Sequence, residues 1–348
     1  MLAINDVSID LGQLVLNHVT LEVERGDYVC LVGPTGAGKT ILFECVMGLQ
    51  IPPTGRVTLD GRDITRLPPE DRGVGYVPQD YALFPHMNVF DNMAYGLIEH
   101  RVPAQEIRRR VGEVAKLLNI DHLLERRPST LSGGEAQRTA LGRALVLERE
   151  LILMDEPFGA LDQVTKRQLF KYLKAIHAEL GLTVMHVTHD FGEAFGLATK
   201  VAVLLGGRLC QVGSVEDVFL RPATREVATF LGITNVWSRQ DLLGCPESVV
   251  SRAALAVLDS SEECILACLP PDSITVLWDG QQPPDGAVQG PAVIQGLRWQ
   301  GSQCELELDA GLPVVATNAA RAVASMGVTV GDTITVALHP MDVHPMKR

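Results

Sequence analysis

The sequence contains 348 residues, which is more than one ordinary domain and fewer than three, so we expect two domains. Hydrophobic residues make up 46% of the chain and charged residues 21%, a balance typical of a folded protein. Its 42 acidic residues outnumber the 30 lysines and arginines, and this excess argues against a nucleic-acid partner. It leaves room for a small anion site, because a few backbone N–H groups and one lysine can bind a phosphate.

The N-terminus and the cysteines also exclude some classes of protein. The first ten residues, MLAINDVSID, lack the basic and apolar regions of a signal peptide, and no apolar run approaches the roughly 20 residues that span a bilayer. The seven cysteines are scattered without a paired C-x-x-C pattern, so we expect reduced thiols rather than disulfides or structural zinc.

In chain order, the first part of the sequence alternates between strand and helix patterns. Tyr28–Val32 is a continuous apolar run, typical of a strand that is covered on both faces. The glycine-rich loop Gly33–Gly38 joins it to Thr40–Leu49, where apolar residues recur at helical spacing. Further strands are expected at Val19–Val23, Arg56–Leu59, Val74–Val77, Leu151–Met154, Leu182–Val187 and Val201–Leu205, and a helix at Val164–Leu180. This alternation indicates a mainly parallel sheet with helices on both faces.

Two other regions have different patterns. Charged and apolar residues recur at helical spacing within residues 87–148, which predicts an inserted helical layer. After residue 232, short alternating runs between Pro/Gly turns predict a small all-β domain over 233–348. Two hexapeptides there, LPPDSI at 269–274 and LHPMDV at 338–343, resemble each other. Two half-barrels from one ancestral unit would explain the similarity, as would chance.

Residues 33–40, GPTGAGKT, fit the pattern G-x-x-x-x-G-K-[ST] in full. Glycines at these positions let the backbone wrap closely, so that N–H groups point at phosphate oxygens. The lysine would reach the β and γ phosphates of ATP, and the threonine hydroxyl would ligate Mg²⁺. The predicted nucleotide-binding residues are Gly33, Pro34, Thr35, Gly36, Ala37, Gly38, Lys39 and Thr40.

A pair of acids follows the apolar run Leu151–Met154. Many strands end in acids, so the pattern is informative only because the phosphate loop precedes it. Asp155 would position the water shell of Mg²⁺, and Glu156 would polarise the attacking water as a catalytic residue.

The sequence LSGGE at 131–135 stands just before a predicted helix, where free N–H groups could bind an anion or simply be capped. In chain order come the phosphate loop, Gln79, LSGG, the acidic strand end, Ala160-Leu161-Asp162 and His189. This order resembles the nucleotide-binding subunit of ABC transporters over residues 1–232. The resemblance implies an α/β P-loop NTPase fold of the ABC type with a helical subdomain at about 87–148. A small all-β, OB-like domain would follow at 233–348.

The resemblance also implies roles for single residues. Gln79 resembles the glutamine that contacts Mg²⁺ and the attacking water, and His189 the switch histidine near the γ-phosphate. Ser132, Gly133 and Gly134 would contact nucleotide held by a second copy of the chain. Asp162 would help to pass the state of one site to the other. The expected assembly is a head-to-tail dimer with two ATP molecules at its interface.

This chain departs from the family pattern at two positions. These ATPases usually carry an aromatic residue near position 11 that stacks on adenine, whereas this chain has Leu11 between Asp10 and Gly12. We therefore expect weak base stacking and poor discrimination between ATP and GTP. Glu135 stands where Gln is commonest, and we expect this variant to be tolerated.

The segment Tyr81–Met87 (YALFPHM) resembles the groove in which importers dock a short helix of the permease, although loop packing would explain it as well. The resemblance implies an importer ATPase bound peripherally at the cytoplasmic face of the cell membrane. A periplasmic or extracellular substrate-binding protein would act with it indirectly.

Several stretches, including Phe84–Val89 and Phe230–Val236, look most like the molybdate/tungstate import ATPases. In such proteins the tail can bind the oxyanion, and the candidate donors here are Asn318, Arg321 and Ser325, unless they only belong to a capped short helix. The alternatives are the same ATPase role for sulfate, iron, polyamine or sugar import with a purely structural tail. A soluble ABC-type ATPase acting on nucleic acid or ribosomes is a more remote alternative.

Overall fold

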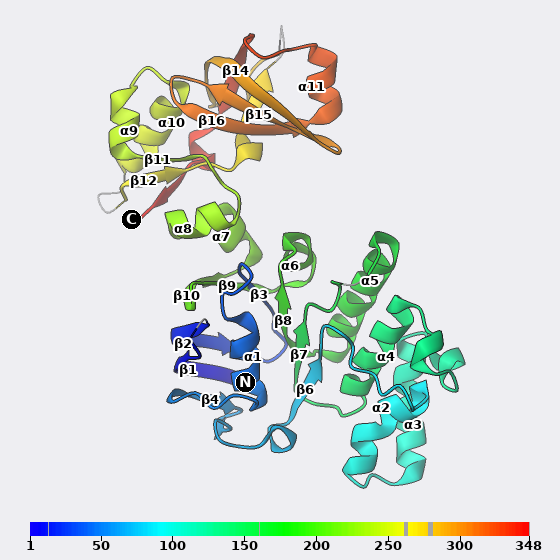
Figure 1. The fold of residues 1–348 in the computed structure, drawn as a ribbon. Coiled ribbons are helices and arrows are strands. Elements are labelled where there is room, and N and C mark those ends of the chain that lie inside the picture. The colour runs from blue at the N-terminus through cyan, green and yellow to red at the C-terminus, as the bar shows by residue number, and fades with distance from the viewer. Residues whose placement is uncertain (13, 160, 261–263, 278–280, 348) are drawn as a thin grey trace. The chain divides into compact units, whose positions relative to one another are not determined.

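The computed structural model describes residues 1–12, 14–159, 161–260, 264–277 and 281–347. The chain forms two compact units, Met1–Val215 and Glu216–Arg348, and each is described by itself (Figure 1). The division lies N-terminal to the boundary expected at residue 232. None of the seven cysteines, all of which lie in the described residues, forms a disulfide bond. Among the helices of the described residues, none combines the length and the apolar character of a bilayer-spanning segment.

The centre of the first unit is a six-stranded sheet in the order β10-β9-β3-β8-β7-β6. Its strands are β3 (Tyr28–Val32), β6 (Val74–Val77), β7 (Leu151–Asp155), β8 (Thr183–Thr188), β9 (Lys200–Leu205) and β10 (Arg208–Gly213). All neighbours pair in parallel except β10, which is antiparallel to β9. The predicted mainly parallel sheet is confirmed. Its parallel strands place their carboxyl ends at one edge, and every residue of β3, β7 and β8 is buried.

A second, antiparallel sheet of the first unit has the order β2-β1-β4-β5. Its strands are β1 (Leu2–Asp10), β2 (Val15–Val23), β4 (Thr54–Leu59) and β5 (Arg62–Asp63). One hydrophobic cluster contains residues of both sheets and of helix α1 (Lys39–Met47), for example Ile4, Leu42 and Leu153. Helices α5 (Gln163–Leu180) and α6 (Phe191–Leu197) follow β7 and β8. α1 is therefore held by the core, with its N-terminus at the carboxyl edge of β3.

The predicted helical layer lies between β6 and β7. It consists of α2 (Val89–Glu99), α3 (Ala104–Leu117) and α4 (Gly133–Leu145), which gather beside the β6 edge of the sheet (Figure 1). Asn88 caps α2 by accepting a hydrogen bond from the N–H of Asp91. Gly142 of α4 leaves room for Met93 of α2, because a Cβ there would lie 2.7 Å from the Met93 Cε. Short 3₁₀ turns at Asp121–Leu123 and Pro128–Thr130 connect α3 to α4, and a further turn, Pro69–Asp71, precedes β6.

The second unit is built on two antiparallel sheets, as the predicted all-β domain requires. The first, β11-β12-β18, contains Val236–Ser238, Leu266–Cys268 and His344–Met346. The second, β13-β17-β14-β15-β16, contains Thr275–Leu277, Thr333–Leu338, Val288–Gln300, Gln303–Asp309 and Pro313–Ala319. Five short helices accompany them in the described chain: α7 (Val215–Leu220), α8 (Arg225–Phe230), α9 (Arg239–Gly244), α10 (Val249–Leu258) and α11 (Ala320–Met326).

The two similar hexapeptides of the second unit share one local structure. LPPDSI forms a 3₁₀ turn, Pro271–Ser273, between β12 and β13, and LHPMDV forms the turn Pro340–Asp342 between β17 and β18. β13 pairs with β17, and β12 pairs with β18, both antiparallel. The two strand–turn–strand units therefore pair with each other in reverse order, which is the arrangement that related half-units would have.

The C-terminus of α1 is closed by a buried arginine. Gly48 ends the helix with φ +89° and donates its N–H to the Glu44 carbonyl oxygen at 2.9 Å. Arg72 is only 2% exposed and donates to the carbonyl oxygens of Cys45 and Val46, at 2.7 and 2.8 Å. The negative end of the helix dipole favours a cation here, so the guanidinium satisfies carbonyls that the helix leaves open.

We expect Gly48→Ala to destabilise the first unit. A Cβ at residue 48 would lie 2.4 Å from the Arg72 Nε, and the positive φ adds strain. Each such strained position costs about 1 to 3 kcal/mol. Scanning calorimetry of the full chain should show a lower melting temperature. Gly112→Ala is the control, because Gly112 lies within α3 with open space around it and should not lower stability. Equal melting temperatures for both variants would contradict this account.

Candidate functional site

The phosphate loop connects β3 to α1, as its sequence pattern requires. Gly38 is the N-cap of α1 with φ +100°, and neither a capping side chain nor an acidic residue stands in the first turn. The N–H groups of that turn are therefore available to an anion. Gly33 must remain a glycine for another reason, since a Cβ there would lie 2.2 Å from the carbonyl oxygen of Leu204 in β9.

Lys39 places a positive charge inside this loop. The side chain is buried, and its Nζ donates to the carbonyl oxygens of Gly33 and Pro34 at 2.7 and 2.9 Å. Burial lowers the pKa of Lys39, while the charges of Glu156 and Asp155 oppose that shift. The ammonium thus bridges the first two residues of the loop and faces the acids at the end of β7.

Asp155 and Glu156 differ in their surroundings although they are neighbours. Asp155 is the last residue of β7, and burial, followed by the charge of Glu156, raises its pKa. Glu156 lies just beyond the strand with φ +43°, an unfavourable backbone conformation for a residue with a Cβ. Its N–H donates to the carbonyl oxygen of Val187 at 2.9 Å, which holds this turn against β8.

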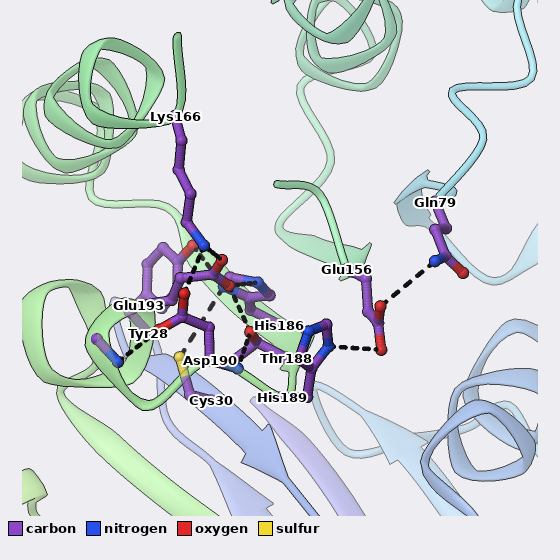
Figure 2. A network of polar contacts seen from close by, with 11 residues as sticks. Tyr28, Cys30, Gln79, Glu156, Lys166, His186, Thr188, His189, Asp190 and Glu193 are labelled. Atoms are coloured by element: carbon purple, nitrogen blue, oxygen red, sulfur yellow. Dashed lines mark hydrogen bonds and ion pairs between the residues drawn. The ribbon is translucent and has the colours of Figure 1, made fainter. Parts of the chain in front are cut away.

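Glu156 is the meeting point of three strand ends (Figure 2). The Gln79 Nε2, from the segment after β6, donates to the Glu156 Oε2 at 3.3 Å. The His189 Nδ1, from the segment after β8, lies 3.2 Å from the Glu156 Oε1. The ring of His189 is 68% exposed at the side chain, so it can also face a ligand. The structure brings these three predicted residues together.

A cavity of about 370 Å³ lies between the phosphate loop and these acids. Five of the eight phosphate-loop residues line it, together with Gln79, Asp155 and Glu156. Three apolar residues that carry no sequence motif, Leu14, Ile41 and Val187, line it as well. The full lining is Leu14, Thr35, Gly36, Gly38, Lys39, Thr40, Ile41, Gln79, Asp155, Glu156 and Val187. The sequence does point toward Leu14, because it lies three residues after Leu11, where the family usually has an aromatic residue beside the nucleotide.

The remaining predicted residues lie outside this cavity. Ser132 caps α4 in a capping box with Glu135, whose carboxylate accepts the Ser132 N–H at 2.7 Å; Ser132 and Gly133 are exposed, and Gly134 is buried. The observed Glu135 therefore has a structural role at the helix start. Asp162 caps α5 by accepting from the N–H groups of Val164 and Thr165. Ala160 of the predicted Ala160-Leu161-Asp162 motif lies outside the described residues.

The cavity offers oxygen donors of the kind that Mg²⁺ prefers. Thr40 supplies a hydroxyl, Gln79 an amide oxygen and Asp155 a carboxylate, and all three line the same cavity. Among the described residues, no group of three or more His, Cys, Asp or Glu side chains could hold a metal ion by itself. A hard cation that keeps much of its water shell and shares its ligands with a phosphate fits these donors.

Comparison with known proteins places this geometry in context. A family model described as ABC transporter matches residues 16–159. The molybdate/tungstate import ATP-binding protein of Pyrococcus horikoshii is 43% identical over 318 residues, which are 89% of each chain. The protein of the same description from Thermococcus kodakarensis is 52% identical over 236 residues, 68% of this chain and 72% of its own. The sulfate/thiosulfate import ATP-binding protein of Yersinia pseudotuberculosis is 45% identical over 237 residues, 67% of this chain and 65% of its own.

Solved structures agree with the fold. The cbiO1 protein of Clostridium perfringens, described as part of an ABC transporter complex, is 28% identical with a TM-score of 0.58, covering 63% of this chain and 90% of its own. A dimeric ATP-binding cassette described as bound to ADP and Pi is 28% identical with a TM-score of 0.56, covering 62% of this chain and 99% of its own. The predicted P-loop fold of the ABC type is confirmed.

We expect the chain to bind ATP and GTP with affinities within about threefold of each other, because no aromatic ring at residue 11 offers the roughly 1–3 kcal/mol of base stacking. Leu11 is 48% exposed, and its N–H donates to the carbonyl oxygen of Leu14 on the cavity wall. Leu11→Tyr should raise ATP affinity by about tenfold. Competition against a fluorescent ATP analogue measures both effects.

The control for this experiment is Leu49→Tyr, which adds the same ring at an exposed position that does not line the cavity. It should leave both affinities unchanged. A strong preference of the unmodified chain for ATP would contradict the prediction.

Proposed function

The chain belongs to the ABC transporter family of ATP-binding proteins, and on this premise we propose that it energises an importer of molybdate or tungstate. As a member of that family it binds nucleotide and is an ATPase coupled to transport. The observation that carries the catalytic assignment is the position of Glu156. It lies on the wall of the cavity next to the phosphate loop, in contact with both Gln79 and His189.

In this mechanism the protein contributes positioning and electrostatic stabilisation. Lys39 and the N–H groups of the loop bind the β and γ phosphates. Glu156 aligns the attacking water and accepts its proton as the water oxygen bonds to the γ-phosphorus, while the bond from that phosphorus to the bridging oxygen breaks and ADP leaves. His189 contacts one oxygen of the Glu156 carboxylate, and Gln79 donates a hydrogen bond to the other. Mg²⁺, held through Thr40, Gln79 and Asp155, would neutralise charge on the phosphates.

We expect Glu156→Gln to lower kcat for ATP hydrolysis by about 100-fold or more, since a general base contributes about 10² to 10⁴. The amide keeps the shape of the side chain, so ATP affinity should change little. Steady-state phosphate release and equilibrium nucleotide binding measure the two quantities. Glu179→Gln, at an exposed position of α5, is the control and should retain full activity. A Glu156→Gln variant with normal kcat would refute the assigned role.

A second copy of the chain would complete each site. Ser132 and Gly133 are exposed at the start of α4, and Asp162 stands at the start of α5, yet none of them lines the cavity of its own chain. A helix start that is exposed to solvent can contact the phosphates of a nucleotide that a partner copy holds. The dimeric form of the cassette described as bound to ADP and Pi supports this assembly.

The permease would dock near Tyr81–Met87, which would place the chain peripherally at the cytoplasmic face of the membrane. Arg143 supports this segment from behind by donating to the carbonyl oxygens of Tyr81 and Ala82 at 2.8 and 2.6 Å. The ring of Phe84 packs against Tyr95, with centroids 4.6 Å apart, and Tyr95 remains partly exposed. A supported, partly exposed aromatic surface fits a short amphipathic helix. A substrate-binding protein would act only through the permease.

The substrate assignment rests on how far the relatives match. The molybdate/tungstate relative from Pyrococcus horikoshii matches 89% of this chain, whereas the sulfate/thiosulfate relative matches 67%. The first match is long enough to include much of the tail.

In the tail, the amide nitrogen of Asn318 is buried without a hydrogen-bond partner among the described residues, and Arg321 is exposed nearby in sequence. Ser325, in contrast, donates to the carbonyl oxygen of Ala322 at 2.8 Å. Asn318 and Arg321 are therefore the better oxyanion donors.

Calorimetric titration of the full chain tests the oxyanion proposal. Tungstate and molybdate should bind at micromolar concentration or tighter and sulfate more weakly, while Arg321→Ala should weaken the binding of both metal oxyanions. Arg252→Ala, at an exposed position in α10, is the control. If none of the three anions bound, the sensing role would be wrong and the tail would be structural. Tighter binding of sulfate would favour sulfate import.

A further inference from the structure

A polar network lies beside His189, and the mechanism above does not use it (Figure 2). We call it the switch network and define it as Lys166, His186, Thr188, Asp190 and Glu193. Lys166 comes from α5, His186 and Thr188 from β8, and Glu193 from α6, while Asp190 caps α6. The network therefore joins two helices to the strand that ends at the site.

Glu193 is the buried centre of the network. It is 4% exposed, and an unpaired carboxylate at such a position would be strongly destabilising. Its Oε1 lies 2.5 Å from the Lys166 Nζ, and its Oε2 accepts from the hydroxyl of Thr188 and lies 3.4 Å from the His186 Nε2. Burial alone would raise the pKa of Glu193, but contacts with His186, Lys166 and Thr188 outweigh it and hold that pKa at about 2. The carboxylate is a fixed negative charge.

Lys166 is linked to the residues on both sides of His189, directly to Asp190 and through Glu193 to Thr188. Its Nζ lies 2.5 Å from the Asp190 Oδ2 and 2.5 Å from the Glu193 Oε1. Asp190 directly follows His189, and Glu193 binds Thr188, which directly precedes it. The N–H of Asp190 also donates to the Thr188 hydroxyl at 3.0 Å. One ammonium thus constrains the backbone before and after the histidine that contacts Glu156.

The other end of the connection is the start of α5. Lys166 lies in the first turn of that helix, and its N–H donates to the carbonyl oxygen of the cap residue Asp162 at 2.9 Å. Asp162 is the residue through which a partner copy would report its state. A covalent and hydrogen-bonded path therefore runs from Asp162 through Lys166 to the segment of His189, and from His189 to Glu156.

We propose that Lys166 is a positioning residue for ATP hydrolysis, which couples the start of α5 to the His189 segment through Asp190 and Glu193. This inference rests on the proposed ATPase function. Lys166 does not line the nucleotide cavity, so it acts on kcat through the placement of His189 and Glu156. Nucleotide affinity, which depends on the phosphate loop, does not involve it.

The test compares Lys166→Met, Lys166→Arg and Lys174→Met in the full chain. Lys174 is exposed on the same helix and is the matched control. Lys166→Met should lower kcat at least tenfold and change KM for ATP less than threefold. Lys166→Arg keeps a cation that can reach both carboxylates, and its kcat should remain within threefold of the unmodified protein. Lys174→Met should behave like the unmodified protein.

Several results would overturn the proposal. Lys166→Met with kcat within threefold of the unmodified protein would do so, and so would failure of Lys166→Arg to restore kcat. A rise in KM without a loss of kcat would assign Lys166 to nucleotide binding instead. If Lys166→Met shows no cooperative melting, the milder Lys166→Gln is measured by the same criteria. An unmodified protein without ATPase activity would refute the proposed function itself, which is a different outcome from any of these.

Discussion

The parallel register of the central sheet is the constraint on which the site depends. Val32 of β3 pairs with Thr188 of β8, and Asp155 of β7 pairs with Val187 of β8. The strands therefore end within about one residue of each other, and the segments that follow them begin on a common line. Side chains from distant parts of the sequence therefore meet at this edge, as Gln79, Glu156 and His189 do. Ligands in such folds bind at the carboxyl edge for this reason.

Three buried charges of the described chain, Lys39, Asp155 and Glu193, lie near this edge. Lys39 is held by two carbonyls, Asp155 lies within the influence of Lys39, and Glu193 is held by Lys166. Glu156 differs from the others, because it is less buried, has a positive φ and is contacted by two side chains, of which His189 is largely exposed. A residue of this kind can change partners when a ligand arrives, while the fixed charges around it keep their positions.

Much of the first unit could be predicted from the sequence, because its signals are local. A continuous apolar run before a glycine loop indicates a buried strand, and helix α5 ends at Leu180, as its pattern predicts. The helices α9 and α10 are not evident from the sequence. The apolar stretch Val249–Leu258 stands among strand-like runs and is too short to show a clear helical period. The contact between Lys166 and Glu193 was not predicted either. It depends on how α5 and α6 pack on the sheet, which no local pattern encodes. The roles of the site residues remain predictions.

The closed end of α1 has a consequence for the divergence of related sequences. The Arg72 guanidinium fills the space that a side chain at residue 48 would need, so residue 48 must be a glycine while Arg72 is present. Arg72 also contacts the carbonyl oxygens of Leu67 and Thr65, so a shorter residue there would leave several acceptors open at once. Neither position lines the nucleotide cavity. Substitutions at the two positions should nevertheless be correlated among homologues. The cause of this covariation would be packing rather than catalysis.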